Sequence, residues 1–127
     1  MDTTFLVDLI RGDPGARALL ESAESGSEAV RVPAPAVAKL WEALERSRHP
    51  PREAERVREV LASAPEVAFT VEHAVRTGRI LGTLAREGLA VDPMDAMVAA
   101  VAVEEDEALV TRNRELDRVV GLRIRPY

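Results

Sequence analysis

Apolar residues recur along this chain at the spacing of amphipathic helices, and short apolar runs lie between them. The clearest stripe is in residues 35–48, where Val37, Leu40 and Leu44 fall on one helical face. Residues 93–105 are almost entirely apolar, which is typical of a helix buried on all sides. The pattern predicts helices over residues 3–10, 16–23, 35–48, 52–62, 71–87 and 93–105, a helical turn over 114–119, and strands over 29–32, 67–69, 108–111 and 122–124.

Capping and helix-breaking residues set the limits of these elements. Gly88 is expected to end the helix over residues 71–87. Asp92 and Pro93 have the residue types of an N-cap and a first helical position. The small polar residues 22–27 predict a loop after the second helix.

Short strands that alternate with helices favour an α/β fold with a parallel sheet covered on both faces. At this length the default is a single domain, residues 1–127, large enough for a core of its own. On the helix over residues 71–87, Val75, Ile80 and Leu84 are expected to face that core.

Composition excludes several kinds of site. The chain has no cysteine, so it forms neither a disulfide nor a thiolate metal site, and a cytoplasmic location is expected. His49 and His73 lie far apart in sequence, which argues against a histidine-based zinc site. No apolar stretch reaches the roughly 20 residues of a bilayer span, so no membrane association is expected. The net charge of -5 disfavours a generally sticky nucleic-acid surface, although a bound metal would supply the positive charge that a nuclease needs.

Three polar residues beside apolar runs are candidates for a site. They are Asp2, Asp95 and Asn113. Side chains at strand ends and helix starts can meet at one rim of an α/β sheet, where ligands are usually bound. Each residue also has a local explanation, because Asp2 and Asn113 can cap the segments that follow and Asp95 gains from the dipole of its helix. Their positions in the sequence leave both explanations open.

Four blocks of sequence, taken in order, resemble the PIN-domain family, and in particular the VapC-type ribonuclease toxins. The blocks are DTTFLVDLIRGD, VPAPAVAKLWEAL, DPMDAMVAAVAV and LVTRNRELDRVVGLRI. Each block is weak by itself, but four in this order over nearly the whole chain are fairly specific. The resemblance implies a PIN-like three-layer α/β/α sandwich with a short parallel sheet.

The resemblance also implies an acidic cluster that binds Mg²⁺ or Mn²⁺ and hydrolyses RNA phosphodiester bonds. Carboxylate oxygens suit these hard cations, which orient an attacking water and stabilise charge on the phosphate. Asp2 and Asp95 match the family's first and third acids, and Asn113 stands at the position of the fourth. Arg112 and Arg114 flank this position and are candidates for binding RNA phosphates.

Lys39 is the main departure from the family, because it aligns where the second block carries a glutamate. It is the only lysine among the 17 basic residues. At ~4 Å and an effective dielectric near 20, each added positive charge costs a bound cation roughly 4 kcal/mol, or about a thousandfold in affinity. Glu42, one helical turn further on, is a candidate replacement acid. Alternatively, Lys39 and Glu42 simply pair on the helix surface.

Three explanations of Lys39 are open. It is a natural change in which the ammonium stands in for the metal, a selected or engineered inactivating change, or a lysine whose ammonium reaches solvent. The predicted function is a metal-dependent ribonuclease of a VapC-like toxin–antitoxin system, which Lys39 would impair. The alternative is a catalytically inactive PIN-like module that binds protein or RNA. The resemblance further implies a VapB-like antitoxin as partner and a homodimer.

Overall fold

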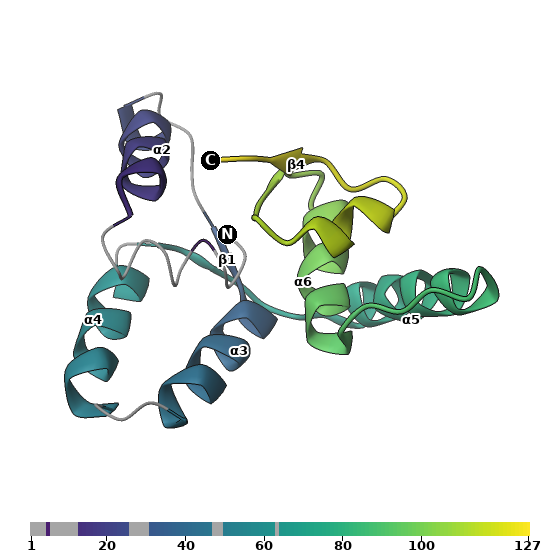
Figure 1. The fold of residues 1–127 in the computed structure, drawn as a ribbon, viewed down its shortest axis with the longest axis horizontal. Coiled ribbons are helices and arrows are strands. Elements are labelled where there is room, and N and C mark those ends of the chain that lie inside the picture. Colours follow the sequence, from purple (N-terminus) through teal and green to yellow (C-terminus); the bar gives the residue numbers. More distant parts are fainter. Residues whose placement is uncertain (1–4, 6–12, 26–30, 47–49, 63) are drawn as a thin grey trace.

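The computed structural model describes residues 5, 13–25, 31–46, 50–62 and 64–127. Helices and strands alternate along these residues (Figure 1). The elements are α2 (Pro14–Ser25), β1 (Val32–Pro33), α3 (Ala34–Glu45), α4 (Pro50–Ala62), β2 (Glu66–Val67), α5 (Val71–Arg86), α6 (Pro93–Glu104), β3 (Leu109–Val110), the 3-10 helix η1 (Arg114–Arg118) and β4 (Ile124–Arg125).

The strands pair in parallel, as predicted. β1 pairs with β2, with Val32 opposite Glu66, and β3 pairs with β4, with Leu109 opposite Ile124. Parallel neighbours need a crossover connection, which α3 and α4 provide between β1 and β2. Because the strands are short, their bounds differ from the predicted ones by one to three residues where the structure describes both.

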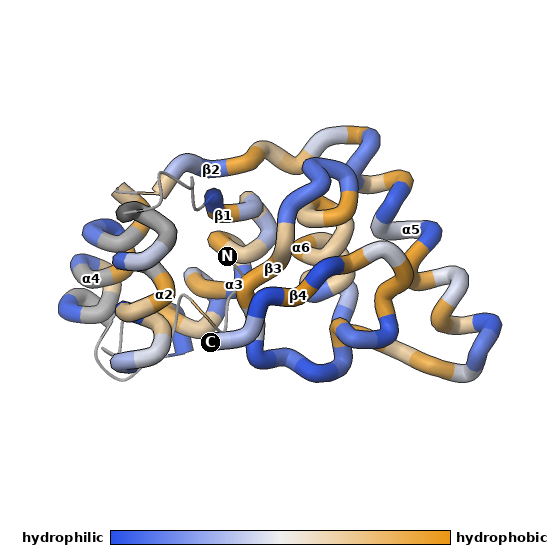
Figure 2. Tube along the Cα trace, turned by 90° about the horizontal axis from the view of Figure 1, so that it is seen from above, coloured by the Kyte–Doolittle hydropathy of each residue, from blue (hydrophilic) through white to orange (hydrophobic). Residues whose placement is uncertain are grey.

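α6 lies at the centre of the core. Figures 1 and 2 show it between α3 and α5, and it packs against both helices. Its residues Ala96 and Val98 to Val101 are no more than 2% exposed. The prediction of a helix buried on all sides is therefore confirmed. Because both flanks of α6 are packed, the side chains at its two ends are held in place relative to α3 and α5.

The inward face of α5 differs from the predicted one. The expected burial of Val75 is wrong, because this residue is 51% exposed. His73 and Thr77 are buried ahead of Ile80 in its place. These polar residues tolerate burial because they are hydrogen-bonded: Thr77 Oγ1 donates to the His73 carbonyl at 2.8 Å, and His73 Nδ1 accepts from the Thr70 N–H at 2.9 Å.

α2 is longer than the sequence predicts. The expected start at Ala16 and the expected loop from Ser22 are wrong, because the helix runs to Ser25. At its start, the Asp13 carboxylate accepts the Ala16 N–H at 2.9 Å, and Pro14 takes the first helical position. This Asp-Pro pair is the same signature that correctly predicted the start of α6.

Two further predictions concern the ends of helices. α4 begins at Pro50, two residues before its expected start, because proline fits the first helical turn. Gly88 follows the end of α5 with a positive φ of 73°, as expected of a glycine at a helix terminus. The helix expected over residues 3–10 lies outside the described residues apart from Phe5, which is helical and buried. None of the described helices is long and apolar enough to cross a membrane.

Candidate functional site

The first turn of α6 carries Asp95, and local sequence fixes its position. The Asp92 carboxylate accepts the N–H groups of Met94 at 2.9 Å and of Asp95 at 3.2 Å, so it is Asp92 that caps the helix. Pro93 follows at the first helical position. In these contacts Asp95 contributes its backbone N–H and not its side chain. The residue is only 6% exposed. A buried carboxylate needs polar or charged partners, because burial without them is costly.

Lys39 on α3 is one of these partners. Its Nζ lies 2.6 Å from Asp95 Oδ1, across the contact between α3 and α6. The Lys39 side chain is 29% exposed and that of Asp95 8%. The explanation in which the ammonium simply reaches solvent is therefore wrong. Instead, the ammonium neutralises a buried carboxylate from a residue 56 positions away in sequence.

Asn113 brings a third segment to the same carboxylate. Its Nδ2 donates to Asp95 Oδ2 at 3.2 Å, while its Oδ1 accepts the Glu115 N–H at 3.1 Å and so caps η1. Its own N–H donates to Thr111 Oγ1 at 3.0 Å. The amide orientation, assigned from these hydrogen bonds, turns the nitrogen of Asn113 toward Asp95. Asn113 is therefore a helix cap and a contact of Asp95 at the same time.

The remaining predicted acids are Asp2 and Glu42. Asp2 lies outside the described residues. Glu42 is half exposed on α3, and its carboxylate pairs with Arg46 at 3.0 Å. The alternative of a Lys39–Glu42 surface pair is therefore wrong. Thus Lys39 contacts Asp95 on another helix, whereas Glu42 pairs with the nearby Arg46.

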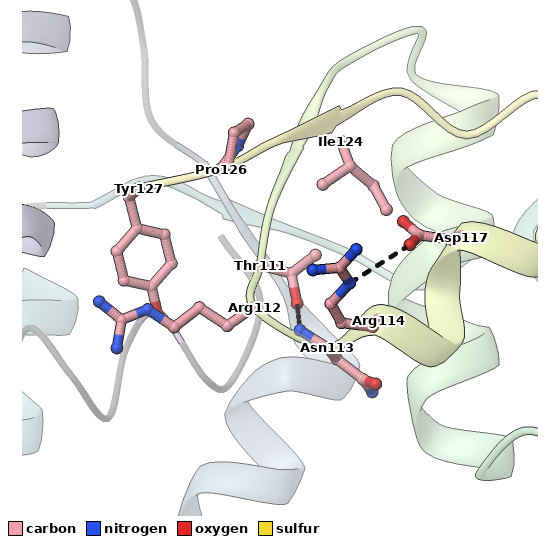
Figure 3. A pocket seen from close by; sticks show the side chains of 8 residues that line it. All are labelled: Thr111, Arg112, Asn113, Arg114, Asp117, Ile124, Pro126 and Tyr127. Atoms are coloured by element: carbon pink, nitrogen blue, oxygen red, sulfur yellow. Dashed lines mark hydrogen bonds and ion pairs between the residues drawn. The ribbon is translucent and has the colours of Figure 1, made fainter.

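Beside this centre, residues that follow β3 and residues in and after β4 line a pocket of about 590 Å³ (Figure 3). Arg112, Asn113 and Arg114 are on its wall, so the predicted phosphate ligands lie next to the Asp95 centre. The Arg112 guanidinium carbon lies 4.4 Å from the centre of the Tyr127 ring. No role was predicted for Tyr127. The available signal was its position just beyond β4, because parallel strands end at the same sheet edge.

A sequence profile of the PIN domain matches residues 1–122, nearly the whole chain. The chain belongs to the PIN-domain family. The predicted resemblance is thereby confirmed. In this PIN domain Lys39 and Asn113 both contact the Asp95 carboxylate.

This PIN domain is similar to VapC proteins. It is 27% identical to Ribonuclease VapC2 of Haemophilus influenzae over 124 residues, which is 97% of this chain and 92% of that protein. Over 60 residues, 46% of each chain, it is 38% identical to the tRNA(fMet)-specific endonuclease VapC of Salmonella typhimurium. These matches agree with the VapC-type resemblance of the four sequence blocks.

Solved structures of VapBC complexes share the fold. The VapBC2 structure from Rickettsia felis, bound to a promoter DNA fragment, gives a TM-score of 0.91 at 20% identity and covers 99% of this chain and 96% of that chain. The DNA-bound VapBC structure from Salmonella typhimurium gives 0.87 at 28% identity, with 98% and 94% covered. The predicted PIN-like α/β sandwich is therefore confirmed.

The described residues of the Asp95 centre do not fit a divalent metal as they stand. Mg²⁺ and Mn²⁺ are held by several oxygen ligands, whereas Asp95 meets the Lys39 ammonium and the Asn113 amide nitrogen. A protonated lysine cannot ligate a cation, and it repels one. Within the described part of the chain, no group of three or more His, Cys, Asp or Glu side chains is placed to hold a metal ion.

Proposed function

We propose that this PIN domain is a VapC-type ribonuclease of a toxin–antitoxin pair, with its active centre at Lys39, Asp95 and Asn113. The observation that carries the proposal is the convergence of three distant segments on one buried carboxylate. The relatives named ribonuclease VapC2 and tRNA(fMet)-specific endonuclease VapC support RNA as the substrate. Asp2 enters the proposal as the first acid, on the family resemblance alone.

The proposal includes a requirement for Mg²⁺ or Mn²⁺ and an impairment of this chain by Lys39. The ammonium lies 2.6 Å from the carboxylate that a cation would need. At ~4 Å and an effective dielectric near 20, one unit charge is worth roughly 4 kcal/mol before screening. We therefore expect this chain to hold a metal and to cleave RNA far less well than a form with an acid at position 39.

The chain's own residues would bind and orient the RNA. Arg112 and Arg114 stand beside Asn113 in one pocket, and guanidinium groups bind phosphate through paired N–H donors. Asn113 is held in place by its hydrogen bonds to Thr111 and Glu115. A phosphate bound at the arginines would therefore lie close to the Asp95 carboxylate.

A second function is favoured by the Lys39–Asp95 ion pair itself. In this alternative the ammonium takes the place of the metal permanently, and the chain is an inactive PIN-like module that binds RNA or protein without cleaving RNA. The pair is partly shielded from solvent, so salt screens it less than a fully exposed pair.

We further propose an antitoxin partner of VapB type and assembly as a homodimer. The VapBC complexes of similar fold support the antitoxin. Exposed apolar side chains on α5 offer surface for a protein contact, since Val71 is 76% and Val75 51% exposed.

The deciding experiment compares the unchanged chain with Lys39→Glu. Isothermal calorimetry would measure Mn²⁺ affinity, and cleavage would be followed on an initiator tRNA transcript. We expect Lys39→Glu, which changes the charge at this position by two units, to bind Mn²⁺ about a thousandfold more tightly or better and to gain cleavage activity. The control is Arg46→Glu, which makes the same charge change at the C-cap of the same helix, at a side chain that is 79% exposed.

Each outcome distinguishes the two functions. If Lys39→Glu gains Mn²⁺ affinity and cleavage activity and Arg46→Glu gains neither, the chain is a ribonuclease disabled by one residue. Absence of metal binding and cleavage in both variants rules out the impaired ribonuclease. Binding of the tRNA transcript by the unchanged chain would then support the inactive RNA-binding module.

A further inference from the structure

The pocket beside the Asp95 centre has the size and chemistry for part of a nucleic acid strand. Its volume is about 590 Å³, and it shares Asn113 with that centre (Figure 3). Its wall combines the guanidinium groups of Arg112 and Arg114 with the apolar side chains of Ile124 and Tyr127. A nucleotide offers the same combination, because it joins an anionic phosphate to a flat, largely apolar base.

Arg112 is held in place within this pocket. Its guanidinium lies over the Tyr127 ring, 4.4 Å from the ring centre, and 3.4 Å from Asp13 Oδ2. The Tyr127 ring in turn packs edge-on against Phe5, with centroids 5.0 Å apart and an interplanar angle of 79°. Phe5 is only 1% exposed. The guanidinium is therefore positioned through an aromatic ring that is anchored to the core.

Arg114 is held more loosely. Its Nε is 3.8 Å from Asp117 Oδ2, and the arginine side chain is 92% exposed. Figure 3 shows both side chains on the Ile124 side of the pocket. An exposed ion pair at this distance is weak, so a phosphate, which accepts paired hydrogen bonds from a guanidinium, can replace the Asp117 carboxylate.

We propose that this pocket binds one nucleotide of the RNA strand beside the Asp95 centre, and that Tyr127 is the residue that positions Arg112 for it. The proposal rests on the proposed RNA-directed function. Arg112 and Arg114 take the phosphate, and the base stacks on the guanidinium plane of Arg112, a platform that proteins use for unpaired bases. Tyr127 acts through Arg112: it holds the guanidinium flat and lowers the entropy lost when RNA binds.

The test measures RNA binding by fluorescence anisotropy, with a short labelled single-stranded RNA of mixed sequence, over a range of salt concentrations. Tyr127→Leu keeps an apolar side chain but loses the ring, whereas Tyr127→Phe keeps the ring. We expect Tyr127→Leu to weaken binding about two- to fivefold, in line with an exposed cation–π contact, and Tyr127→Phe to retain it. Thermal melting of both variants checks that the fold is intact.

Two further variants give effects of opposite sign. Arg112→Ala should weaken binding and lower the slope of log affinity against log salt by about 0.7, the value for one lost contact to a single strand. Asp117→Asn should tighten binding, because Arg114 loses its competing carboxylate. Asp106→Asn is the matched control: it removes the same charge at a side chain that is 95% exposed and pairs with Arg123.

The outcomes separate this proposal from the proposed function. If the unchanged chain binds RNA while Tyr127→Leu and Arg112→Ala bind equally well with the same salt slope, the pocket is not the nucleotide site and the proposed function stands. If Asp117→Asn and Asp106→Asn tighten RNA binding equally, the assignment of the pocket is also overturned, because the effect then comes only from the change in net charge. Both proposals are overturned if the unchanged chain binds no RNA and the Lys39→Glu variant gains no cleavage activity.

Discussion

The two ends of α6 accommodate negative charge in different ways. At the N-terminal end, among the described residues, the buried carboxylate of Asp95 meets the Lys39 ammonium and the Asn113 amide. At the C-terminal end several glutamates stand near solvent. The helix dipole favours a carboxylate at the first end and disfavours it at the second. The dipole therefore favours the buried Asp95 carboxylate at the first end, whereas it opposes the glutamates at the second end, which need donors from other segments.

The donors at the C-terminal end come from other segments. The pairs are Arg76 Nε with Glu104 at 2.6 Å, His73 Nε2 with Glu105 at 3.2 Å, and Arg31 Nε with Glu107 at 2.7 Å. Arg31 also lies 3.4 Å from Glu105. The hydrogen bond that Arg31 donates to the Glu107 carboxylate raises the pKa of Arg31 above its ordinary value, so this cation stays charged. These contacts tie the start of β1 and the start of α5 to the end of α6.

The hydrogen bonds of His73 assign the tautomer of its ring. Its Nδ1 accepts the Thr70 N–H at 2.9 Å, so the proton of the neutral ring is assigned to Nε2, which donates to Glu105. Glu105 thus has two partners, His73 and Arg31. At the C-terminal end the ion pairs are partly exposed, and Glu105 keeps one partner if the other is lost. At the N-terminal end the Lys39 ammonium places a full positive charge beside the buried Asp95 carboxylate. The comparison indicates that charge changes are tolerated at the C-terminal end and are costly at the N-terminal end.

The largest effect is expected from Lys39→Ala. This change removes the positive charge that Lys39 supplies to the buried Asp95 carboxylate, and we expect a loss of about 3 kcal/mol in the free energy of unfolding. Lys39→Ala combined with Asp95→Asn should recover much of the loss, because the buried group is then neutral. Urea denaturation measures both. Arg46→Ala, at the exposed C-cap of α3, is the control, and a similar loss there would contradict the contrast between the two ends.

A smaller effect is expected from His73→Leu. The leucine fills a similar space but leaves the Thr70 N–H without its acceptor and removes one of the two partners of Glu105, at a cost of about 1–2 kcal/mol. Denaturation of the variant beside Val75→Ala, a change at an exposed position of the same helix, isolates the hydrogen bonds from helix propensity. Equal stability of His73→Leu and the unchanged chain would show that the network contributes nothing at this end.

The smallest effect is expected from Arg31→Ala. The Arg31 side chain is 30% exposed, and its partners Glu105 and Glu107 are 34% and 42% exposed. We expect a loss of about 1 kcal/mol or less, which shrinks as salt is added. Thermal melting at low and high salt measures it. A salt-independent loss as large as that of Lys39→Ala would remove the distinction between the two ends.

Local rules explain which features the sequence determined. Asp92 and Pro93 predicted the start of α6, Gly88 the end of α5, and an apolar run the burial of α6. Each of these signals acts within a few residues, through a backbone hydrogen bond or a restricted φ, and does not depend on distant segments. The sequence also singled out Asp95 and Asn113 as polar residues beside apolar runs, and Lys39 as the only lysine, at the place where the family resemblance implies a glutamate. Their catalytic role remains a prediction.

Only the tertiary structure decided how these residues are used. Nothing local indicated that the Lys39 ammonium points at Asp95 rather than at solvent or Glu42, because that depends on the packing of α3 against α6. Burial of His73 in place of Val75 likewise depends on a partner, Glu105, at the end of another helix. The stacking of Arg112 on Tyr127 requires two strand ends to meet. A sequence specifies such contacts only through the whole fold, since their energy is gained when distant segments pack together.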